Sequence, residues 1–335
     1  MDRFTTCFGI LVEVEDLLRL QSVEDIQQAL TTTNKLKDYI IVGGGSNLIL
    51  SDEKRHKIAV VDVKGMVLIP GPSPEERGEV VLRVGAGESW DKVVQFAVEN
   101  NLQGIEALSA IPGTAGAAPV QNIGAYGTEI KDVLWKVEAV EKATGQVKEF
   151  TNEECKFAYR NSIFKQELKD RFIITAIYLK LQNSKTALLP RSKEVQEIFK
   201  DRKDTKCTLQ EIRDAIIKIR WNKLPKPEEL GNVGSFFHNP IISISQLEEL
   251  KKILPEVPVY EFGERFKVPA GYLIEQAGLK GFRQGNVGIY EKHALVLVNH
   301  GGASFKELEN LIDFIKQTIF EKYKIQLSVE PELVV

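Results

Sequence analysis

Two short polar segments contain residue types that could support chemistry. Tyr159-Arg160-Asn161-Ser162 places an arginine beside hydroxyls, and an arginine can hold a carboxylate or stabilise developing negative charge. Gly234-Ser235-Phe236-Phe237 places a serine before two aromatic residues, where its hydroxyl could sit in a dry pocket and donate a proton to a carbanion. An ion pair for Arg160 and a turn-capping role for Ser235 are the alternatives. Both residues are candidate catalytic positions.

The C-terminal tail contributes a candidate acid. Apolar residues at positions 325, 327 and 329 alternate with polar residues up to Glu330, which is the pattern of a half-buried strand. Glu330 then faces away from the apolar side, and plain exposure to solvent is the alternative. Glu332 lies two residues further along, so the tail offers two candidate acids.

Four glycine-rich segments indicate places where a ligand could approach the backbone closely. They span residues 43–47, 85–90, 111–119 and 121–127. Consecutive glycines allow backbone amides to converge on an anion, and the amide side chains of the last segment could hydrogen-bond to a heterocycle. Four structural turns are the alternative. Together the segments favour a ligand cradle.

Several common site types do not fit the sequence. No Gly-Lys-Ser/Thr follows residues 43–47, so this is not a P-loop, and Trp90 stands where a dinucleotide fingerprint has its third glycine. Ser235 lacks the Gly-x-Ser-x-Gly pattern of a hydrolase nucleophile. The three cysteines and four histidines show no metal-ligand spacing. We therefore expect no metal site and no nicotinamide-type Rossmann domain.

The composition is that of a soluble globular protein. Hydrophobic residues make up 43% and charged residues 27% of the 335 residues, and this length predicts two or three lobes. The 44 basic and 47 acidic side chains are interspersed, so nucleic acid is not an expected partner. No stretch resembles a signal peptide or a membrane span. A cytoplasmic location without a membrane partner is expected.

Strand-like and helix-like segments alternate along the chain and predict an α+β fold. Ser22, Ser89 and Ser304 precede helical patterns, which is typical of N-terminal caps. Residues 184–204 are polar with weak periodicity and predict an irregular excursion. The predicted strands are 39–42, 58–63, 80–84, 133–140, 172–181 and 294–298. The predicted divisions of the chain are 1–66, 67–215, 216–318 and a tail, 319–335, that returns to the body.

Taken in order, these segments resemble the UDP-N-acetylenolpyruvoylglucosamine reductase (MurB) family. The resemblance rests on Gly43–Asn47, residues 111–127, residues 159–164 and Gly234–Phe237. It implies a FAD-binding fold of the vanillyl-alcohol-oxidase (PCMH) type, with FAD held by the first two lobes and a third lobe that covers the substrate. It also implies that NADPH reduces FAD, and that the flavin then passes hydride to the enolpyruvyl group of a UDP-sugar. The product would be UDP-N-acetylmuramate, a peptidoglycan precursor.

The resemblance implies roles for individual residues. Arg160 and Glu330 would polarise the enolpyruvyl group, and Ser235 would donate a proton to the resulting enolate. Glu330 is preferred to Glu332 because its spacing from Leu327 fits the family. The implied substrate-binding residues are Tyr159, Lys223 and Asn239. The implied FAD-binding residues are Gly43, Gly44, Gly45, Ser46, Asn47, Ile111, Pro112, Gly113, Gln121, Asn122 and Gly124.

Two departures from the family pattern leave alternatives open. The larger form of the family usually has a tyrosine that closes over the diphosphate from an excursion before the third lobe, whereas residues 181–210 contain no tyrosine. Thr6-Cys7-Phe8-Gly9 stands where Asn-Thr-Phe-Gly is typical. A flavin oxidase or dehydrogenase of the same fold and a non-catalytic UDP-sugar-binding relative are the alternatives. We expect a monomer.

Overall fold

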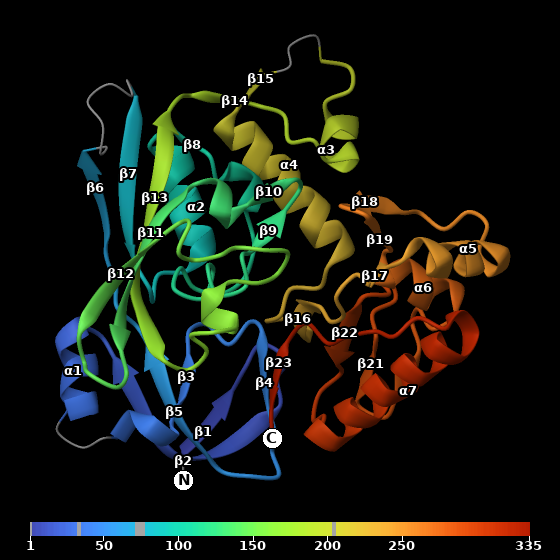
Figure 1. Cartoon of the computed structure of the whole chain (residues 1–335), viewed down its shortest axis with the longest axis horizontal. Coiled ribbons are helices and arrows are strands. Elements are labelled where there is room, and N and C mark those ends of the chain that lie inside the picture. The colour runs from blue at the N-terminus through green and yellow to red at the C-terminus, as the bar shows by residue number, and fades with distance from the viewer. Residues whose placement is uncertain (1, 32–34, 71–77, 203–205) are drawn as a thin grey trace. The chain divides into compact units, whose positions relative to one another are not determined.

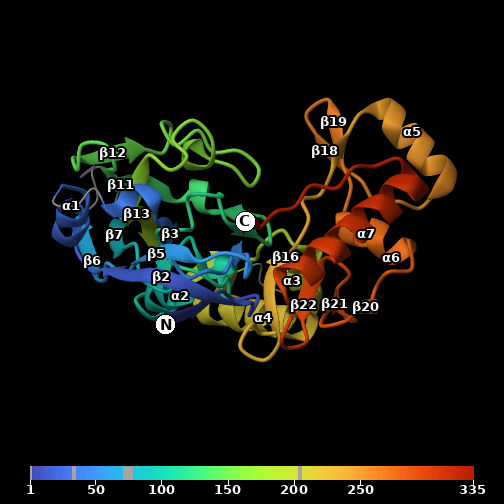
Figure 2. The ribbon, with the colours of Figure 1, turned by 90° about the horizontal axis from the view of Figure 1, so that it is seen from below.

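The computed structural model describes residues 2–31, 35–70, 78–202 and 206–335. It contains two compact units, and each is assembled from separate stretches of chain. Unit 1 comprises Met1–Val14, Gly45–Arg55 and Trp221–Val335, and unit 2 comprises Glu15–Gly44 and His56–Arg220. Figures 1 and 2 show the ribbon in two views. The sequence-predicted boundary at residue 318 falls inside a helix that ends at Tyr323.

Unit 2 is built around an antiparallel sheet with the strand order β12-β11-β13-β7-β6. The long strand β13 (Phe172–Asn183) is at its centre and is almost continuously buried, which explains its nearly unbroken apolar sequence. The other strands of this sheet are β6 (Met66–Pro70), β7 (Glu79–Gly85), β11 (Leu134–Glu141) and β12 (Val147–Thr151), and β8 (Leu102–Gln103) also pairs with β13. The helix α2 (Trp90–Glu99) buries Trp90, Val93 and Ala97 in the same core.

Smaller elements complete unit 2. The strand β3 (Ile40–Val42) pairs in parallel with β5 (His56–Val61). The glycine-rich segment follows directly after β3, which ends at Val42. The strand β2 (Leu11–Leu20) begins in unit 1 and ends in unit 2. The remaining elements are α1 (Val23–Thr31), β9 (Gly124–Ala125), β10 (Thr128–Glu129), β14 (Thr186–Leu188), α3 (Lys193–Ile198), β15 (Lys206–Thr208) and α4 (Leu209–Lys223).

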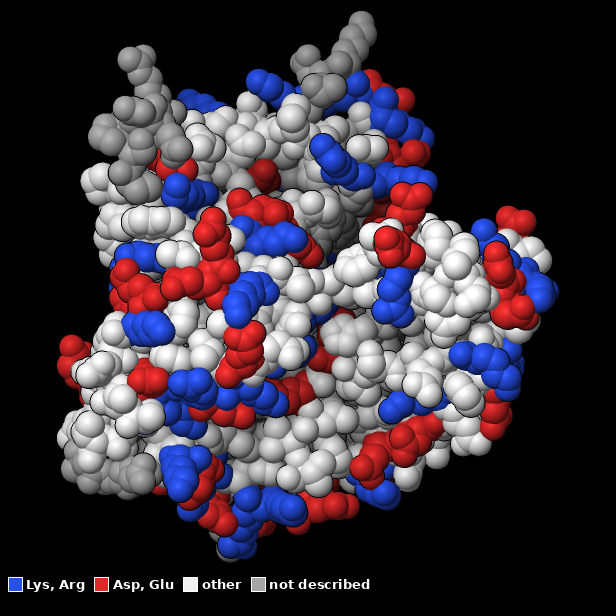
Figure 3. Space-filling view, in the orientation of Figure 1, with Lys and Arg blue, Asp and Glu red and all other residues white. Residues whose placement is uncertain are grey.

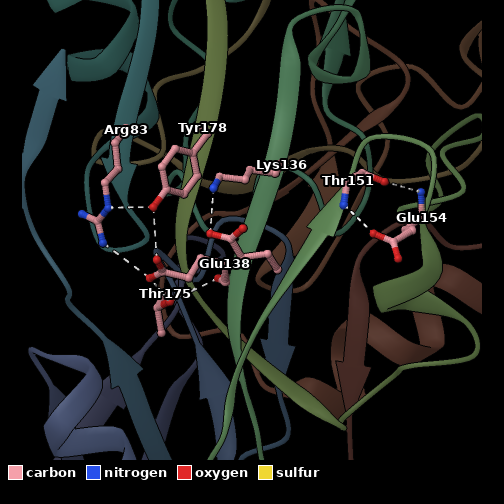
Figure 4. A network of polar contacts seen from close by, with 8 residues as sticks. Arg83, Lys136, Glu138, Thr151, Glu154, Thr175 and Tyr178 are labelled. Atoms are coloured by element: carbon pink, nitrogen blue, oxygen red, sulfur yellow. Dashed lines mark hydrogen bonds and ion pairs between the residues drawn. The ribbon is translucent and has the colours of Figure 1, made fainter. Parts of the chain in front are cut away.

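One face of the central sheet of unit 2 carries a polar network (Figure 4). Arg83 donates to the Tyr178 hydroxyl over 3.2 Å and forms an ion pair with Glu138 at 3.4 Å. The Thr175 hydroxyl donates to the same carboxylate over 2.8 Å. These side chains join β7, β11 and β13, so the network stabilises the register of the three strands.

Unit 1 contains a four-stranded sheet, β16-β22-β21-β20, and the helix α7 packs against β21 and α6. The strand β4 (Leu48–Leu50) pairs in parallel with the last strand, β23 (Glu332–Val334). The other elements are β1 (Asp2–Thr5), β16 (Gly231–Ser235), β17 (Ile241–Ile242), α5 (Ile244–Ile253), β18 (Tyr260–Phe262), β19 (Arg265–Lys267), α6 (Ala270–Gln276), β20 (Arg283–Gln284), β21 (Val287–Ile289), β22 (Val296–Asn299) and α7 (Phe305–Tyr323).

The structure confirms most predicted elements and corrects two. Ser304 caps α7, because its hydroxyl accepts from the Glu307 amide while the Glu307 carboxylate accepts from the Ser304 amide. The predicted irregular excursion at 184–204 contains β14 and α3. The predicted final strand before Glu330 is wrong, because the last strand is β23. Leu327 nevertheless lies buried between exposed neighbours, as the alternation predicts.

Basic and acidic side chains are mixed on the face of the protein shown in Figure 3. This face therefore carries no field of a single sign that would attract a polyanion. Among the described residues, no helix is long and apolar enough to cross a membrane. The same residues contain no group of three or more His, Cys, Asp or Glu side chains that could hold a metal ion.

Candidate active site

The first glycine-rich segment leaves β3 and packs tightly against the third one. A Cβ added to Gly43 would overlap the Thr114 side-chain oxygen, and one added to Gly44 would lie 3.1 Å from the Gly113 Cα. Only glycine allows two backbones to approach this closely. The remaining residues of the segment, Gly45, Ser46 and Asn47, belong to unit 1, where the Gly45 carbonyl accepts from the Cys7 amide.

The Thr114 hydroxyl lies at this junction and fits a cofactor site. Its oxygen is buried and has no hydrogen-bond partner among the described residues. Buried hydroxyls normally have a partner, so an orphaned one beside two glycine-rich loops is what a bound ligand would satisfy. The glycine-rich segment 85–90 also packs against residues 111–119, because a Cβ on Gly116 would lie 2.6 Å from the Ala86 Cβ. The residues present therefore fit the FAD that the resemblance implies.

We expect Gly43→Ala to weaken FAD binding by about 5- to 150-fold, because overpacking of this kind costs about 1–3 kcal/mol. The measurement is the dissociation constant of FAD for the reconstituted apoprotein, from flavin fluorescence. Since Thr114→Ala removes the overlapping oxygen but also the hydroxyl proposed to contact FAD, the double variant should recover only the part of the affinity lost to the overlap. Equal FAD affinity for wild type and Gly43→Ala would show that the loop can relax.

The start of the 111–119 segment is held by charged side chains from two helices. The carboxylate of Asp91, on α2, accepts from the Ala110 amide over 2.6 Å and from Arg213, on α4, over 2.7 and 2.8 Å. The Arg220 guanidinium, also on α4, donates to the Ala110 carbonyl over 3.1 Å. Ala110 has a φ of 56°, so these contacts fix a strained residue directly before Ile111.

Burial and pairing shift the pKa values of these groups in opposite directions. Burial alone would raise the pKa of Asp91, but the hydrogen bonds from Arg213 and from the Ala110 amide outweigh it and hold the pKa below its ordinary value. Burial lowers the pKa of Arg220, although a hydrogen bond to Tyr126 favours its charged form. This cluster was not predicted from the sequence. Its only signal was the seven-residue spacing of Arg213 and Arg220, which puts both on one face of α4.

We expect Asp91→Asn to lower the free energy of unfolding by about 2–3 kcal/mol, because Arg213 is only 7% exposed and would lose its charge partner. The pKa of Asp91 is depressed in the folded state, so its contribution is complete above the ordinary value of 3.8 and is lost as the pH falls through the lower folded value. Urea unfolding at a series of pH values checks both points. The exposed Asp214 on the same helix provides a control variant, Asp214→Asn, with little expected effect.

Arg160 has an unusual backbone conformation and a held guanidinium. Its φ is 52°, a region that costs energy for residues other than glycine. The guanidinium donates to the Gly124 carbonyl over 2.8 Å, lies near the Asn122 carbonyl at 3.5 Å and stacks over the Tyr159 ring at 5.6 Å. Arg160 and the 121–127 segment are therefore brought together in unit 2.

The side chain of Asn122 makes hydrogen bonds within the protein. It is fully buried, and its amide group donates to the Glu129 carboxylate and the Ala158 carbonyl, both over 3.1 Å. Its side-chain oxygen accepts from the Lys131 amide over 3.3 Å. Because its polar side-chain atoms are used within the protein, the side chain supports the loop instead of reading a heterocycle. A backbone contact of this residue with FAD stays a prediction.

Ser235 ends β16 in unit 1 and is exposed, whereas Phe236 and Phe237 are fully buried. The described residues of unit 1 therefore do not enclose the Ser235 hydroxyl in the predicted dry pocket. The turn-capping alternative also fails, because the hydroxyl makes no hydrogen bond to any described residue. The chain bulges just before it, between Asn232 and Ser235, where Gly234 has a φ of 74°. The bulge and the two buried rings present the hydroxyl outward.

The tail brings Glu330 to the serine segment. The Glu330 amide donates to the Phe236 carbonyl over 2.9 Å, and Phe237 forms a β-bridge with Val329. The Glu330 side chain is only 11% exposed, and its carboxylate lies 3.5 Å from His238 Nδ1. Glu332 is exposed. The solvent-exposed alternative for Glu330 is thus wrong, and burial favours Glu330 over Glu332.

The structure places the remaining predicted residues without assigning them a ligand. Asn239 lies beside the serine segment, and its side-chain oxygen accepts from the Ala270 amide at the start of α6 over 2.9 Å. Lys223 is exposed at the end of α4, and Tyr159 is half-buried beside Arg160. Ile111, Pro112, Gly113 and Gln121 lie at the surface of the glycine-rich loops of unit 2, each at least partly exposed.

Comparison with known proteins identifies the family. Residues 16–151 match the FAD binding domain model, and residues 226–334 match the model of the UDP-N-acetylenolpyruvoylglucosamine reductase C-terminal domain. The chain is 41% identical to the UDP-N-acetylenolpyruvoylglucosamine reductase of Flavobacterium johnsoniae over 98% of this chain and 96% of that protein. It is 37% identical to the enzyme of the same name from Pseudomonas aeruginosa, over 97% and 95%.

A solved structure supports the same fold. The structure of UDP-N-acetylenolpyruvylglucosamine reductase (MurB) from Thermus caldophilus is 23% identical, with a TM-score of 0.66 over 100% of this chain and 98% of that one. The expected α+β FAD-binding fold is confirmed. The chain therefore belongs to the UDP-N-acetylenolpyruvoylglucosamine reductase family, whose members are FAD-dependent oxidoreductases of peptidoglycan precursor synthesis.

Proposed function

We propose that this protein reduces the enolpyruvyl group of UDP-N-acetylenolpyruvoylglucosamine to give UDP-N-acetylmuramate, with NADPH as the source of hydride. FAD, when bound, supplies the two-electron chemistry that accepts hydride from NADPH and passes it to the terminal carbon of the enolpyruvyl group. The observation that carries the proposal is the pairing of the Glu330 tail with the Ser235 segment. A serine that could donate a proton and a largely buried acid therefore lie on adjacent segments of one unit.

The proposed roles follow from where charge develops. Hydride addition to the terminal carbon leaves negative charge on the adjacent carbon and its carboxylate. Arg160 stabilises that charge, with its guanidinium oriented by the Gly124 carbonyl. Glu330 polarises the same group, and the Ser235 hydroxyl gives its proton to the adjacent carbon to complete the reduction.

Further contacts are proposed for the two small-molecule partners. Gly43, Gly44 and Gly113, with the Thr114 hydroxyl beside them, hold FAD, as their close packing supports. Substrate contacts come from Tyr159, Lys223 and Asn239. Nucleotide sugars and NADPH are intracellular metabolites, so the proposed location is the cytoplasm. The proposed state is a monomer, which light scattering coupled to size-exclusion chromatography would test.

A half-reaction experiment tests the proposed function. The purified protein should be yellow, should bleach when NADPH is added without oxygen, and should regain its colour when the enolpyruvyl UDP-sugar is added. Failure of NADPH to bleach the flavin would contradict NADPH as the donor. Return of colour with oxygen but not with the UDP-sugar would favour an oxidase, and a colourless protein that binds the UDP-sugar would favour a non-catalytic relative.

A further inference from the structure

His238 is a titratable side chain beside the largely buried acid of the tail, Glu330. Its Nδ1 lies 3.5 Å from the Glu330 carboxylate oxygen, a separation typical of an ion pair and longer than most N–H···O hydrogen bonds. The Glu330 side chain is 11% exposed and that of His238 is 24% exposed. The acid is therefore largely screened from water, while the imidazole beside it keeps contact with solvent.

The backbone holds the two side chains in register. The His238 amide donates to the Ser328 carbonyl over 2.9 Å, and the Glu330 amide donates to the Phe236 carbonyl over the same distance. The β-bridge between Phe237 and Val329 lies between these bonds. Since Phe237 is fully buried, the short antiparallel ladder is anchored in the core. The His238–Glu330 contact is thus a fixed feature of the fold of unit 1.

A buried carboxyl has two ways to avoid the cost of an unpaired charge. It is either neutral or paired with a cation. A histidine can serve both states, because an imidazolium pairs with a carboxylate and a neutral imidazole accompanies a carboxylic acid. Two such groups in contact titrate as one unit, so the neighbour decides how readily the acid gains or loses its proton.

The other titratable groups near this ladder are few. His238 is the only Asp, Glu, His, Lys or Arg of the 231–240 segment. The segments hydrogen-bonded to residues 236–240 contribute Glu330 and the exposed Glu332 from the tail, His293 before Leu295, and Lys267 before Val268.

We propose that His238 is a positioning residue that sets the protonation state of Glu330 and exchanges its proton with solvent. The inference rests on the proposed role of Glu330 in the second half-reaction and extends it by naming the group that tunes this acid. His238 itself touches neither the flavin nor the reacting carbons in this scheme. It acts through the carboxyl group, so its effect should be confined to the step that uses Glu330.

The test is the pH dependence of each half-reaction, measured by stopped flow with the FAD-loaded protein. His238→Gln keeps a polar side chain of similar length but cannot carry a proton charge. We expect flavin reduction by NADPH to stay within about twofold of wild type. The pH midpoint of flavin reoxidation by the UDP-sugar should shift by about one unit or more. His300→Gln removes an exposed histidine of the same unit and should leave both pH profiles unchanged.

Two further variants make the result decisive. His238→Gly opens space beside the acid, and added imidazole should restore much of the wild-type pH profile, which a merely structural histidine would not explain. A His238→Gln profile of reoxidation that overlays wild type would overturn the proposal. Glu330→Gln tests the underlying assignment separately. If that variant reoxidises like wild type, the proposed role of Glu330 fails, and a pH shift in His238→Gln would then need another partner.

Discussion

Ser235→Ala should leave the reduction of FAD by NADPH nearly unchanged and slow the reoxidation of the flavin by the UDP-sugar about 10²-fold or more. The hydroxyl is exposed and makes no hydrogen bond to a described residue, so its loss removes a proton donor without breaking a contact in the fold. Hydride and proton addition belong to the same half-reaction. A defect in proton donation must therefore appear there and not in the first half-reaction.

Stopped-flow absorbance of the flavin separates the two half-reactions directly. Ser328→Ala is a matched control, because this serine is exposed on the neighbouring segment and contributes its backbone carbonyl to the ladder. It should behave like wild type in both steps. An equal loss in both half-reactions of Ser235→Ala would instead indicate disturbed flavin binding and would contradict the assigned role.

Glu330→Gln should slow the same second half-reaction about 10²-fold, whereas Glu332→Gln should change it by less than about twofold. Glutamine keeps the shape of the side chain but removes its exchangeable acidic proton. The two acids differ in surroundings, since the Glu330 side chain is 11% exposed beside His238 and Glu332 is exposed. Single-turnover reoxidation of the reduced flavin measures both variants.

The paired variants also test the choice between the two acids. A large effect of Glu332→Gln with a small effect of Glu330→Gln would reverse the assignment, although the backbone pairing of the tail would stay as described. Thermal melting curves should be recorded alongside, because the largely buried Glu330 side chain contacts His238. A variant with unchanged melting and slowed reoxidation would separate a chemical role from a structural one.

Local sequence patterns were sufficient for many elements of the fold. The continuous apolar run of β13 and the capping pattern at Ser304 predicted elements that the structure confirms. Helix α3 was missed because only Val195 of its six residues is buried, which leaves little apolar periodicity to read. The short ladder between residues 236–238 and 328–330 was missed because nothing local specifies a pairing across such a separation.

The sequence proposed the members of the candidate site, but it could not predict the surroundings of these side chains. The tight packing of Gly44 against Gly113 agrees with the glycine pattern, since close approach of two backbones requires glycine. The buried amide network of Asn122 could not be read from sequence, because its partners Glu129 and Ala158 are set by the fold. The low exposure of Glu330 could not be predicted either, because an alternating pattern does not show which residues pack against its polar side.

The pairing of β4 with β23 has a consequence for synthesis on the ribosome. The strand β4 lies opposite residues Glu332, Leu333 and Val334 of β23. Residues 48–50 therefore leave the ribosomal exit tunnel long before their partner strand has been synthesised. During translation β4 is an unpaired apolar edge, which is the kind of segment that chaperones protect and that aggregates at high expression. Synthesis of residues 332–334 provides this partner, and a nascent chain stalled before residue 332 should remain sensitive to protease within residues 45–55.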